Sequence, residues 1–211
     1  MDPAWSVLET KPHMLHPPSP SSSRSPSRAR DVARPDLSVV VAFQDSEDSI
    51  GHRVHSLAAH LRSLRASFEL LAVNDGSHDN SAALLSLIQS DVPELRVLHA
   101  DVSGRAFLRG AAEARGAVVV LMDAEQPAPL GPLGWALGRL AAGREAVILR
   151  GRYIVARRLL ALPVIVRAAG RGAAFERSFE RRAGELGIDV VGTRPRRAPS
   201  LLDPVLRFLA A

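Results

Sequence analysis

The chain has 211 residues, a net charge of +5 and 46% hydrophobic residues, which suffices for one domain of ordinary size with a buried core. It contains no cysteine, so disulfides and thiolate metal sites are excluded and nothing argues for an oxidising compartment. No apolar run approaches the roughly 20 residues of a membrane span, and the N-terminus lacks a hydrophobic signal core. We expect a cytoplasmic protein.

The charge is distributed unevenly along the chain. Residues 35–140 carry eight basic and thirteen acidic side chains, whereas residues 141–211 carry fourteen arginines and six acids. An acidic half followed by an arginine-rich half predicts a cation site beside a surface that meets anions such as phosphate, nucleic acid or lipid headgroups. A genomic bias towards arginine would produce the same composition without such a function.

Both ends of the chain are predicted to lie outside the folded domain. Residues 1–34 include the Pro-, Ser- and Arg-rich segment 16–27, which cannot bury a core and is expected to be disordered. Residues 201–211 are predicted to form a short amphipathic helix or tail that either packs on the core or contacts a membrane.

Buried strands alternate with helices in the first part of the chain. The strands are predicted at 38–43, 68–73, 95–99 and 117–122, and the helices begin near Ser46, Asp79 and Gly104. Strands that do not alternate between apolar and polar residues are typical of a sheet covered on both faces. The pattern therefore predicts an α/β fold with a mostly parallel, doubly wound sheet and flanking helices.

The second part of the chain gives weaker signals. A helix is predicted at 133–142 and a fifth strand at 146–149. The apolar segment 153–169 is interpreted as helical apart from Pro163. An amphipathic helix at 173–186 and a last strand at 188–191 complete the prediction.

Polar residues follow two of the predicted strands. Gln44 and Asp45 come after the first strand, and Asn74-Asp75-Gly76 follows the second as a turn in which glycine supplies a positive φ. Ligands of open α/β sheets bind at the carboxyl ends of the strands. Neither a G-x-G-x-x-G motif nor a Walker A loop is present, so a dehydrogenase or P-loop site is disfavoured.

Asp123 and Glu125 follow the fourth strand. In an extended chain, residues two apart point to the same side, and carboxylate oxygens suit Mg²⁺ or Mn²⁺. Two solvated acids that open a loop would show the same pattern. With the other two polar clusters, however, this pair predicts a nucleotide site on one rim of the sheet.

The order and spacing of these segments resemble the family 2 glycosyltransferases of GT-A fold. Segments 38–41, 47–50 and 69–81 are similar to the family's first strand, its Pro-x-Tyr-Asn-Glu-like segment and its Val-Asp-Asp-Gly-Ser-x-Asp-x-Thr segment. Segments 104–116 and 122–125 are similar to its Gly-x-x-x-Ala helix and D-x-D segment. Gly151-Arg152-Tyr153 resembles the Gly-Ser-Arg-Tyr segment of polyprenyl-phosphate sugar synthases, such as dolichol-phosphate mannose synthases.

The chain departs from the family pattern at four positions. Ala42 replaces the usual proline, Asp45-Ser46 replaces Asn-Glu, Asn74 replaces the first aspartate of Asp-Asp-Gly-Ser, and Glu125 replaces the second aspartate of D-x-D. At the last three of these positions, the replacing side chains still carry an oxygen that accepts hydrogen bonds. Two interpretations remain open: an active transferase, and a catalytically silent domain that binds nucleotide or serves as an interaction module.

The resemblance implies a nucleotide-sugar half at 35–142 and an acceptor half at 143–200 within one domain, 35–200. It also implies that Asp123 and Glu125 hold Mg²⁺ or Mn²⁺ and that Arg105 and Arg152 bind the donor diphosphate. The residues that would contact the donor nucleotide are Ala42, Phe43, Asp45, Asn74, Asp75 and Gly76.

No acidic pair for a general base is recognised, so the catalytic residue is left unassigned. Glu145, Glu176, Glu180 and Glu185 are isolated, and the last three are interpreted as helix surface. A phosphate acceptor needs no base, which favours a polyprenyl phosphate over a glycan, with peripheral membrane contact. Nucleic-acid binding is disfavoured, since the chain has one Tyr and two Trp.

Overall fold

The computed structural model of the protein describes residues 34–125, 130–168, 170 and 172–193. All of these belong to the compact unit Arg34–Ala211, whereas the other unit, Met1–Ala33, lies outside the described residues. The tail predicted at 1–34, of which only Arg34 is described, and the helix or tail predicted at 201–211 remain predictions. No helix in the described ranges is both long and apolar enough to cross a bilayer.

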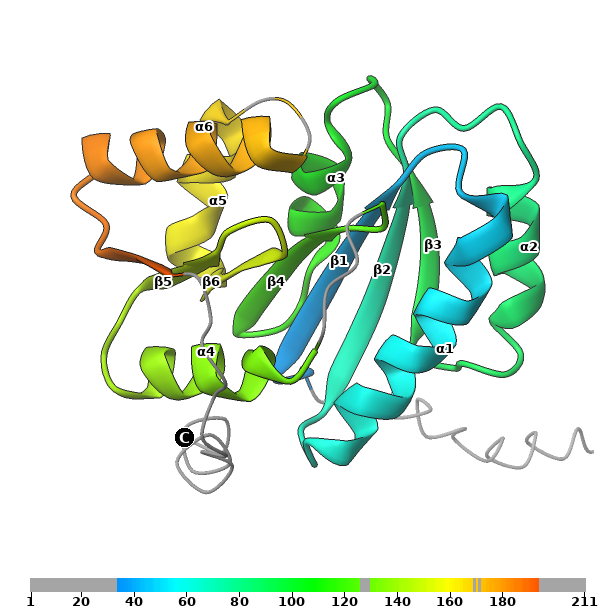
Figure 1. Ribbon diagram of the computed structural model, residues 1–211, viewed down its shortest axis with the longest axis horizontal. Coiled ribbons are helices and arrows are strands. Elements are labelled where there is room, and N and C mark those ends of the chain that lie inside the picture. The colour runs from blue at the N-terminus through cyan, green and yellow to red at the C-terminus, as the bar shows by residue number, and fades with distance from the viewer. Residues whose placement is uncertain (1–33, 126–129, 169, 171, 194–211) are drawn as a thin grey trace, which may run out of the picture. The chain divides into compact units, whose positions relative to one another are not determined.

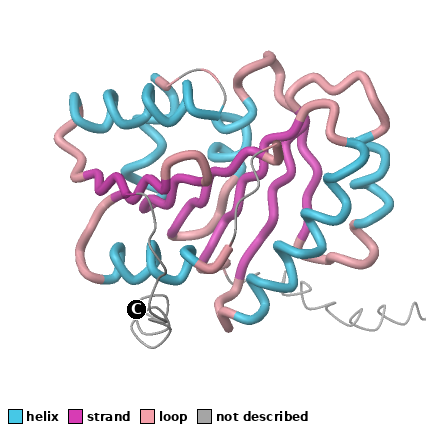
Figure 2. Tube along the Cα trace, viewed as in Figure 1, coloured by secondary structure: helices cyan, strands magenta, loops and turns pink. Residues whose placement is uncertain are grey.

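The described residues form one seven-stranded sheet flanked by helices (Figures 1 and 2). In chain order the elements are β1 (Leu37–Phe43), α1 (Glu47–Ser63), β2 (Phe68–Asn74), α2 (Ser81–Ile88), β3 (Leu95–His99), α3 (Ala106–Glu113), β4 (Val118–Asp123), α4 (Pro132–Ala141), β5 (Ala146–Leu149), β6 (Tyr153–Arg157), α5 (Arg158–Arg167), α6 (Gly172–Glu185) and β7 (Val190–Thr193).

The strand order is β3-β2-β1-β4-β6-β5-β7. Strand β6 is antiparallel to both of its neighbours, β4 and β5, and every other pairing in the sheet is parallel. The prediction of a mostly parallel, doubly wound sheet is therefore confirmed. Of the strands that the described residues form, six have their carboxyl ends at one edge of the sheet, and only β6 ends at the other.

Two hydrophobic layers cover the sheet, one on each face. Helices α1, α2 and α4 pack on one face, and α3, α5 and α6 pack on the other. Successive side chains of a strand point to opposite faces, so Val39 and Val41 enter the first layer while Val40 and Ala42 enter the second. Burial on both faces explains why the strands are continuous apolar runs.

Helix α3 lies very close to the sheet because it carries a glycine at the contact. A Cβ built on Gly110 would lie 2.2 Å from Val40 Cγ1 and 3.1 Å from Val73 Cγ2, so no larger residue fits without displacement. This close approach fixes the position of α3 relative to β1 and β2. The loop that precedes α3 is consequently held at the carboxyl edge of the sheet.

The prediction of a helix from residue 153 was wrong. Residues Tyr153–Arg157 form strand β6, which returns antiparallel after a short turn in which Gly151 has a φ of +68°. A continuous apolar run does not distinguish a buried strand from a buried helix. Helix α5 begins only at Arg158, and it passes through Pro163 without the expected interruption.

Candidate active site

The register of the sheet brings the three polar clusters to adjacent strands. Phe43 pairs with Asn74 on one side of β1, and Ala42 pairs with Asp123 on the other. Because these pairs lie at the carboxyl ends of parallel strands, the residues that follow them gather at one edge. The predicted convergence of the clusters at the rim is thus present in the structure.

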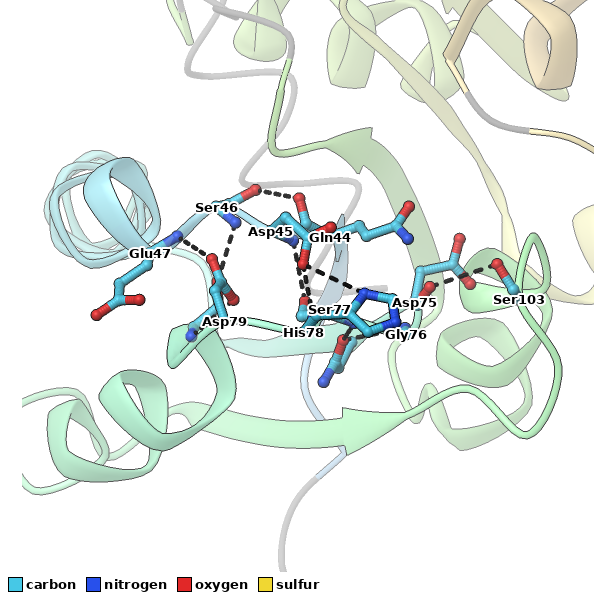
Figure 3. A network of polar contacts seen from close by, with 12 residues as sticks. Gln44, Asp45, Ser46, Glu47, Asp75, Gly76, Ser77, His78, Asp79 and Ser103 are labelled. Atoms are coloured by element: carbon cyan, nitrogen blue, oxygen red, sulfur yellow. Dashed lines mark hydrogen bonds and ion pairs between the residues drawn. The ribbon is translucent and has the colours of Figure 1, made fainter.

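The loop after β1 is hydrogen-bonded to the loop after β2 (Figure 3). The Asp45 amide donates to Ser77 Oγ at 3.1 Å, and the His78 amide donates to Asp45 Oδ1 at 2.6 Å. Asp45 has a φ of +45°, a left-handed conformation that Asp tolerates better than most residues. Its carboxylate remains half exposed, with 50% of the side chain accessible.

The start of α1 is capped by the neighbouring loop and not by its own N-cap residue. Ser46 is the N-cap, as expected, but its hydroxyl donates to the Gln44 carbonyl. The Glu47 amide instead donates to Asp79 Oδ2 at 2.9 Å, and Asp79 Oδ1 accepts from both the amide and the hydroxyl of Ser81. The hydrogen bond from Ser81, followed by those from backbone amides, lowers the pKa of Asp79.

Asn74 and Gly76 form the predicted turn after β2. Asn74 Oδ1 accepts hydrogen bonds from the amides of Gly76 at 3.1 Å and Ser77 at 2.7 Å. Gly76 has a φ of +89°, which confirms the reason for a glycine there. Asn74 is thus engaged in shaping the loop, and it is only 9% exposed.

Asp75 is fully buried and joins three segments of the edge. Its amide donates to the Phe43 carbonyl at 2.9 Å, and its Oδ1 accepts from the Gly104 amide at 2.9 Å. Figure 3 shows Asp75 next to Ser103, whose hydroxyl donates to the Asp75 carbonyl at 3.5 Å. The loop before α3 is therefore attached directly to the end of β2.

Three of the predicted donor-site residues lie at this edge but differ in what they offer a ligand. The side chains of Ala42 and Phe43 are fully buried in opposite core layers, so only their backbones border the edge. Arg105 is the exposed N-cap of α3, and its Nη1 donates to the Val166 carbonyl at 3.4 Å. Its guanidinium therefore lies against the end of α5.

Asp123 ends β4, but Ala124 and Glu125 form a turn, so strand alternation does not extend to Glu125 and the expectation that it places both side chains on one side was wrong. The chain turns after Asp123, whose Oδ1 accepts the Glu125 amide at 2.9 Å. Asp123 is 5% exposed, whereas Glu125 is exposed. The two carboxylates still originate from one tight turn at the rim.

A small hollow lies beside Asp123, between the β5–β6 turn and α6. It is lined by Asp123, Arg152 and Glu176 and has a volume of about 10 Å³, the size of a single water molecule. Both carboxylate oxygens of Glu176 accept the Gly151 amide, at 3.0 and 3.1 Å. Glu176 thereby fixes the turn that carries Arg152.

The interpretation of Glu176 as helix surface was wrong, since it is only 8% exposed. Glu180 and Glu185 do lie at the surface, where they pair with Arg150 and Arg182. Glu176 directly follows the buried Phe175 at the border of the apolar stripe of α6. That position is the only sequence signal that could have indicated its burial.

The acids at the rim suit a cation that is shared with a substrate. No cluster of three or more His, Cys, Asp or Glu that could enclose a metal occurs within the described ranges. Mg²⁺ sites on nucleotides usually combine one or two carboxylates with substrate phosphates and waters. Asp123 and Glu125 could supply the carboxylates of such a site.

A sheet of this order with polar loops at its carboxyl edge defines an α/β fold of the GT-A class, and solved structures agree. A mannosyltransferase from Pyrobaculum calidifontis, in complex with GDP-Man and Mn²⁺, matches with a TM-score of 0.59 at 16% identity over 81% of this chain and 59% of that chain. Glucosyl-3-phosphoglycerate synthase from Mycobacterium tuberculosis, in complex with Mn²⁺, UDP and phosphoglyceric acid, matches with a TM-score of 0.55 at 20% identity over 84% and 78%. At these sequence identities, the two matches are evidence for the fold alone.

The chain belongs to glycosyl transferase family 2, whose sequence profile matches residues 38–152, more than half of its length. Two undecaprenyl-phosphate 4-deoxy-4-formamido-L-arabinose transferases from strains of Pseudomonas fluorescens are 31% and 32% identical over 97 residues. The match covers 44% of this chain but only 29% and 28% of the two relatives. The chain thus spans less than a third of these proteins.

Proposed function

We propose that this chain transfers a sugar from a nucleotide-sugar donor to a phosphate acceptor with the help of a divalent cation. The register of the sheet carries the proposal, because it sets Asn74 and Asp123 on the two strands that flank β1. Adjacent strands lie about 4.8 Å apart, so the loops after β2 and β4 are within the reach of one nucleoside diphosphate. Family membership supports the same reading.

The nucleoside would bind at the loops after β1 and β2. Two aspartates of these loops, Asp45 and Asp75, are predicted to contact the donor, and the Asp45 carboxylate is the more accessible of the two. Carboxylates accept hydrogen bonds from base and ribose donors. Asn74, Asp75 and Gly76 would provide the floor. Their side chains and amides are already hydrogen-bonded within the protein, so the site is formed before the donor arrives.

The diphosphate would bind between the β4 turn and Arg152. Asp123 and Glu125 would hold Mg²⁺ or Mn²⁺ there, and the bound cation would offset the charge that develops on the departing nucleoside diphosphate. Arg152, held beside Asp123 by the Glu176–Gly151 hydrogen bonds, would add a second positive charge. Arg105, at the N-terminus of α3, would be a third contact.

The acceptor would be a phosphate, and specifically a polyprenyl phosphate. A phosphate oxygen is already anionic, so it can form the new bond to the anomeric carbon as the bond to the diphosphate breaks, with no proton to remove. Glu176, one of the two buried acids that line the hollow, already accepts the Gly151 amide with both oxygens. Two similar transferases are named for an undecaprenyl-phosphate substrate.

A detergent-based assay with radiolabelled nucleotide-sugars tests the proposal. With Mn²⁺ and undecaprenyl or dolichyl phosphate we expect a labelled lipid-linked sugar. Labelling of a hydroxyl acceptor but not of the lipid would refute the phosphate acceptor. Donor binding without turnover on any acceptor would refute the transferase and indicate a nucleotide-binding domain.

A thermal-shift screen separates the cation from the nucleotide. A ligand that binds only the native state raises the Tm, so UDP- or GDP-sugars with Mn²⁺ should raise it for the unchanged chain. Asp123→Asn should abolish the part of the shift that depends on Mn²⁺. Asp91→Asn, an exposed acid after α2, is the matched control and should keep the whole shift.

A further inference from the structure

A larger pocket lies at the opposite edge of the sheet, where β1 and β4 begin. Its volume is about 520 Å³, which falls within the range of about 300–1,000 Å³ typical of small-molecule sites. The residues that line it include four arginines: Arg34, Arg115, Arg157 and Arg158. This pocket is separate from the hollow at the carboxyl edge, which lies beside Asp123.

Positive charge dominates this pocket. Among the described residues that line it, Asp36 is the only acid, and its Oδ2 accepts the amide and hydroxyl of Ser67 at 2.8 and 2.7 Å. Within the described part of the chain, no ion pair involves Arg34, Arg115 or Arg158. Several guanidinium groups that share one pocket without partner acids repel one another, and a bound anion would relieve that repulsion.

Two of the arginines are attached to well-bonded backbone next to Gly116. Arg158 Nε donates to the Gly116 carbonyl at 3.1 Å, and the Arg158 amide donates to the Ala117 carbonyl at 2.9 Å. The Arg115 amide donates to Glu69 Oε1 at 2.7 Å, which leaves its exposed side chain attached to a fixed backbone. The two side chains therefore project from a defined frame.

We propose that this pocket binds an anion that carries phosphate groups, through Arg34, Arg115 and Arg158. The planar guanidinium forms paired hydrogen bonds to phosphate oxygens, and three such groups match an anion of more than one charge. Leu159, which is 74% exposed, lines the pocket beside the arginines and would contact an apolar part of the ligand. A soluble polyphosphate and a phospholipid headgroup share this chemistry.

This anion site does not depend on the proposed transfer reaction. Val118 lines the pocket at the start of β4, and Asp123 ends the same strand. Five residue steps along a strand span about 17 Å, so a phosphate in the pocket would not contact the donor diphosphate. The pocket would be a second ligand site, at the edge of the sheet opposite the candidate active site.

Calorimetric titration of the full chain with inorganic pyrophosphate, in EDTA and at constant ionic strength, tests the site. Arg115→Glu and Arg34→Glu should each weaken binding at least about tenfold, since an attractive contact becomes a repulsive one. Arg181→Glu makes the same charge change on exposed α6 and should leave the affinity unchanged. Asp123→Asn should also leave it unchanged.

The second arm uses vesicles of phosphatidylcholine with and without phosphatidylglycerol. Binding to the anionic vesicles that is lost in Arg115→Glu, without binding of pyrophosphate, would support the pocket with a lipid headgroup as its ligand. Arg115→Gln, which only removes the charge, should give a smaller loss and guards against a folding defect. Binding of neither probe, or pyrophosphate binding lost in Asp123→Asn and kept in Arg115→Glu, would overturn the proposal.

Discussion

The two halves of the described chain hold the candidate site together by different means. In the first half, side chains hydrogen-bond to backbone amides of neighbouring loops, as Asp45 does with His78 and Asp75 with Gly104. In the second half, Glu176 makes one such contact with the Gly151 amide, whereas the ion pair of Arg150 with Glu180 is largely exposed to solvent, with side-chain accessibilities of 44% and 38%. Solvent-exposed ion pairs contribute little to the stability of the folded protein, typically about 0–1 kcal/mol.

This difference indicates that the loops proposed to bind the donor are preorganised, while the proposed acceptor side depends on one buried acid. Glu176 is the only acid of α6 that is buried within the described residues. A nucleotide is the common part of many donors, and a rigid site suits it. Because exposed ion pairs contribute little to stability, the loops of the proposed acceptor half can change at a smaller cost in stability.

The largest effect is expected at Asp123, where the two halves meet. Asp123→Asn should lower kcat at least about 100-fold, because an amide is a poor ligand for a hard cation, while the Tm without ligand stays close to that of the unchanged chain. Initial rates over a range of Mn²⁺ concentrations measure this. Asp91→Asn is the control, and full activity of Asp123→Asn at low Mn²⁺ would contradict the metal role.

A pair of helical glycines compares the packing of α3 with that of α4. Gly110→Ala should destabilise the protein by about 1–3 kcal/mol, since its Cβ would overlap the fully buried Val40. A Cβ added at Gly134 in α4 would have no atom within 4 Å, so Gly134→Ala should instead stabilise the protein by about 0.5–1 kcal/mol. Urea unfolding at equilibrium measures both changes, and equal effects would disprove the close approach of α3.

Acid should weaken the hydrogen bonds of the first half. The pKa of Asp79 is lowered in the folded state, so its carboxylate stabilises the protein above its unfolded pKa of about 4, and this stability is lost as the pH falls through the lower folded pKa. Asp79→Asn should therefore lower the Tm at neutral pH, and the difference should shrink as the pH falls below about 4. Thermal unfolding followed by circular dichroism shows this.

Glu180→Gln is the matched change in the second half. Its carboxylate pairs with Arg150 at the surface, so the Tm should be nearly the same as for the unchanged chain at every pH. A loss as large as that of Asp79→Asn would mean that the two halves do not differ in this respect.

The smallest effect is expected at Tyr153. This side chain is 2% exposed, and its hydroxyl has no hydrogen-bond partner among the described residues. Burial accordingly raises its pKa. Tyr153→Phe should be neutral or stabilise the protein by up to about 1 kcal/mol in urea unfolding, because it removes an unsatisfied polar group. A clear loss of stability would indicate a partner for the hydroxyl.

Local pattern was sufficient to predict the fold of the first half. Apolar runs bounded by polar turns predicted β1 to β4 closely, and the glycine in the Asn74 turn has the expected positive φ. The clusters at the carboxyl edge followed from the parallel topology alone. These features depend on residues that are close in the sequence.

The remaining features depend on contacts between distant segments, which the sequence does not display. Strand β6 was missed because its apolar run continues into α5, and only Gly151 marked the hairpin. The burial of Glu176 follows from its hydrogen bonds to the Gly151 amide, 25 residues away. The cap that Asp79 supplies to α1 likewise joins two loops that only the sheet brings together.

The single reversed strand has a consequence for the arginines of the second half. Because β6 runs from the carboxyl edge back to the amino edge, Arg152 precedes it at one end of the sheet, while Arg157 ends it and Arg158 follows it at the other. Neighbours in the sequence thereby acquire separate electrostatic surroundings, and a basic segment that looks uniform is divided between two locations. Altering one group by mutation should leave the ligands of the other untouched.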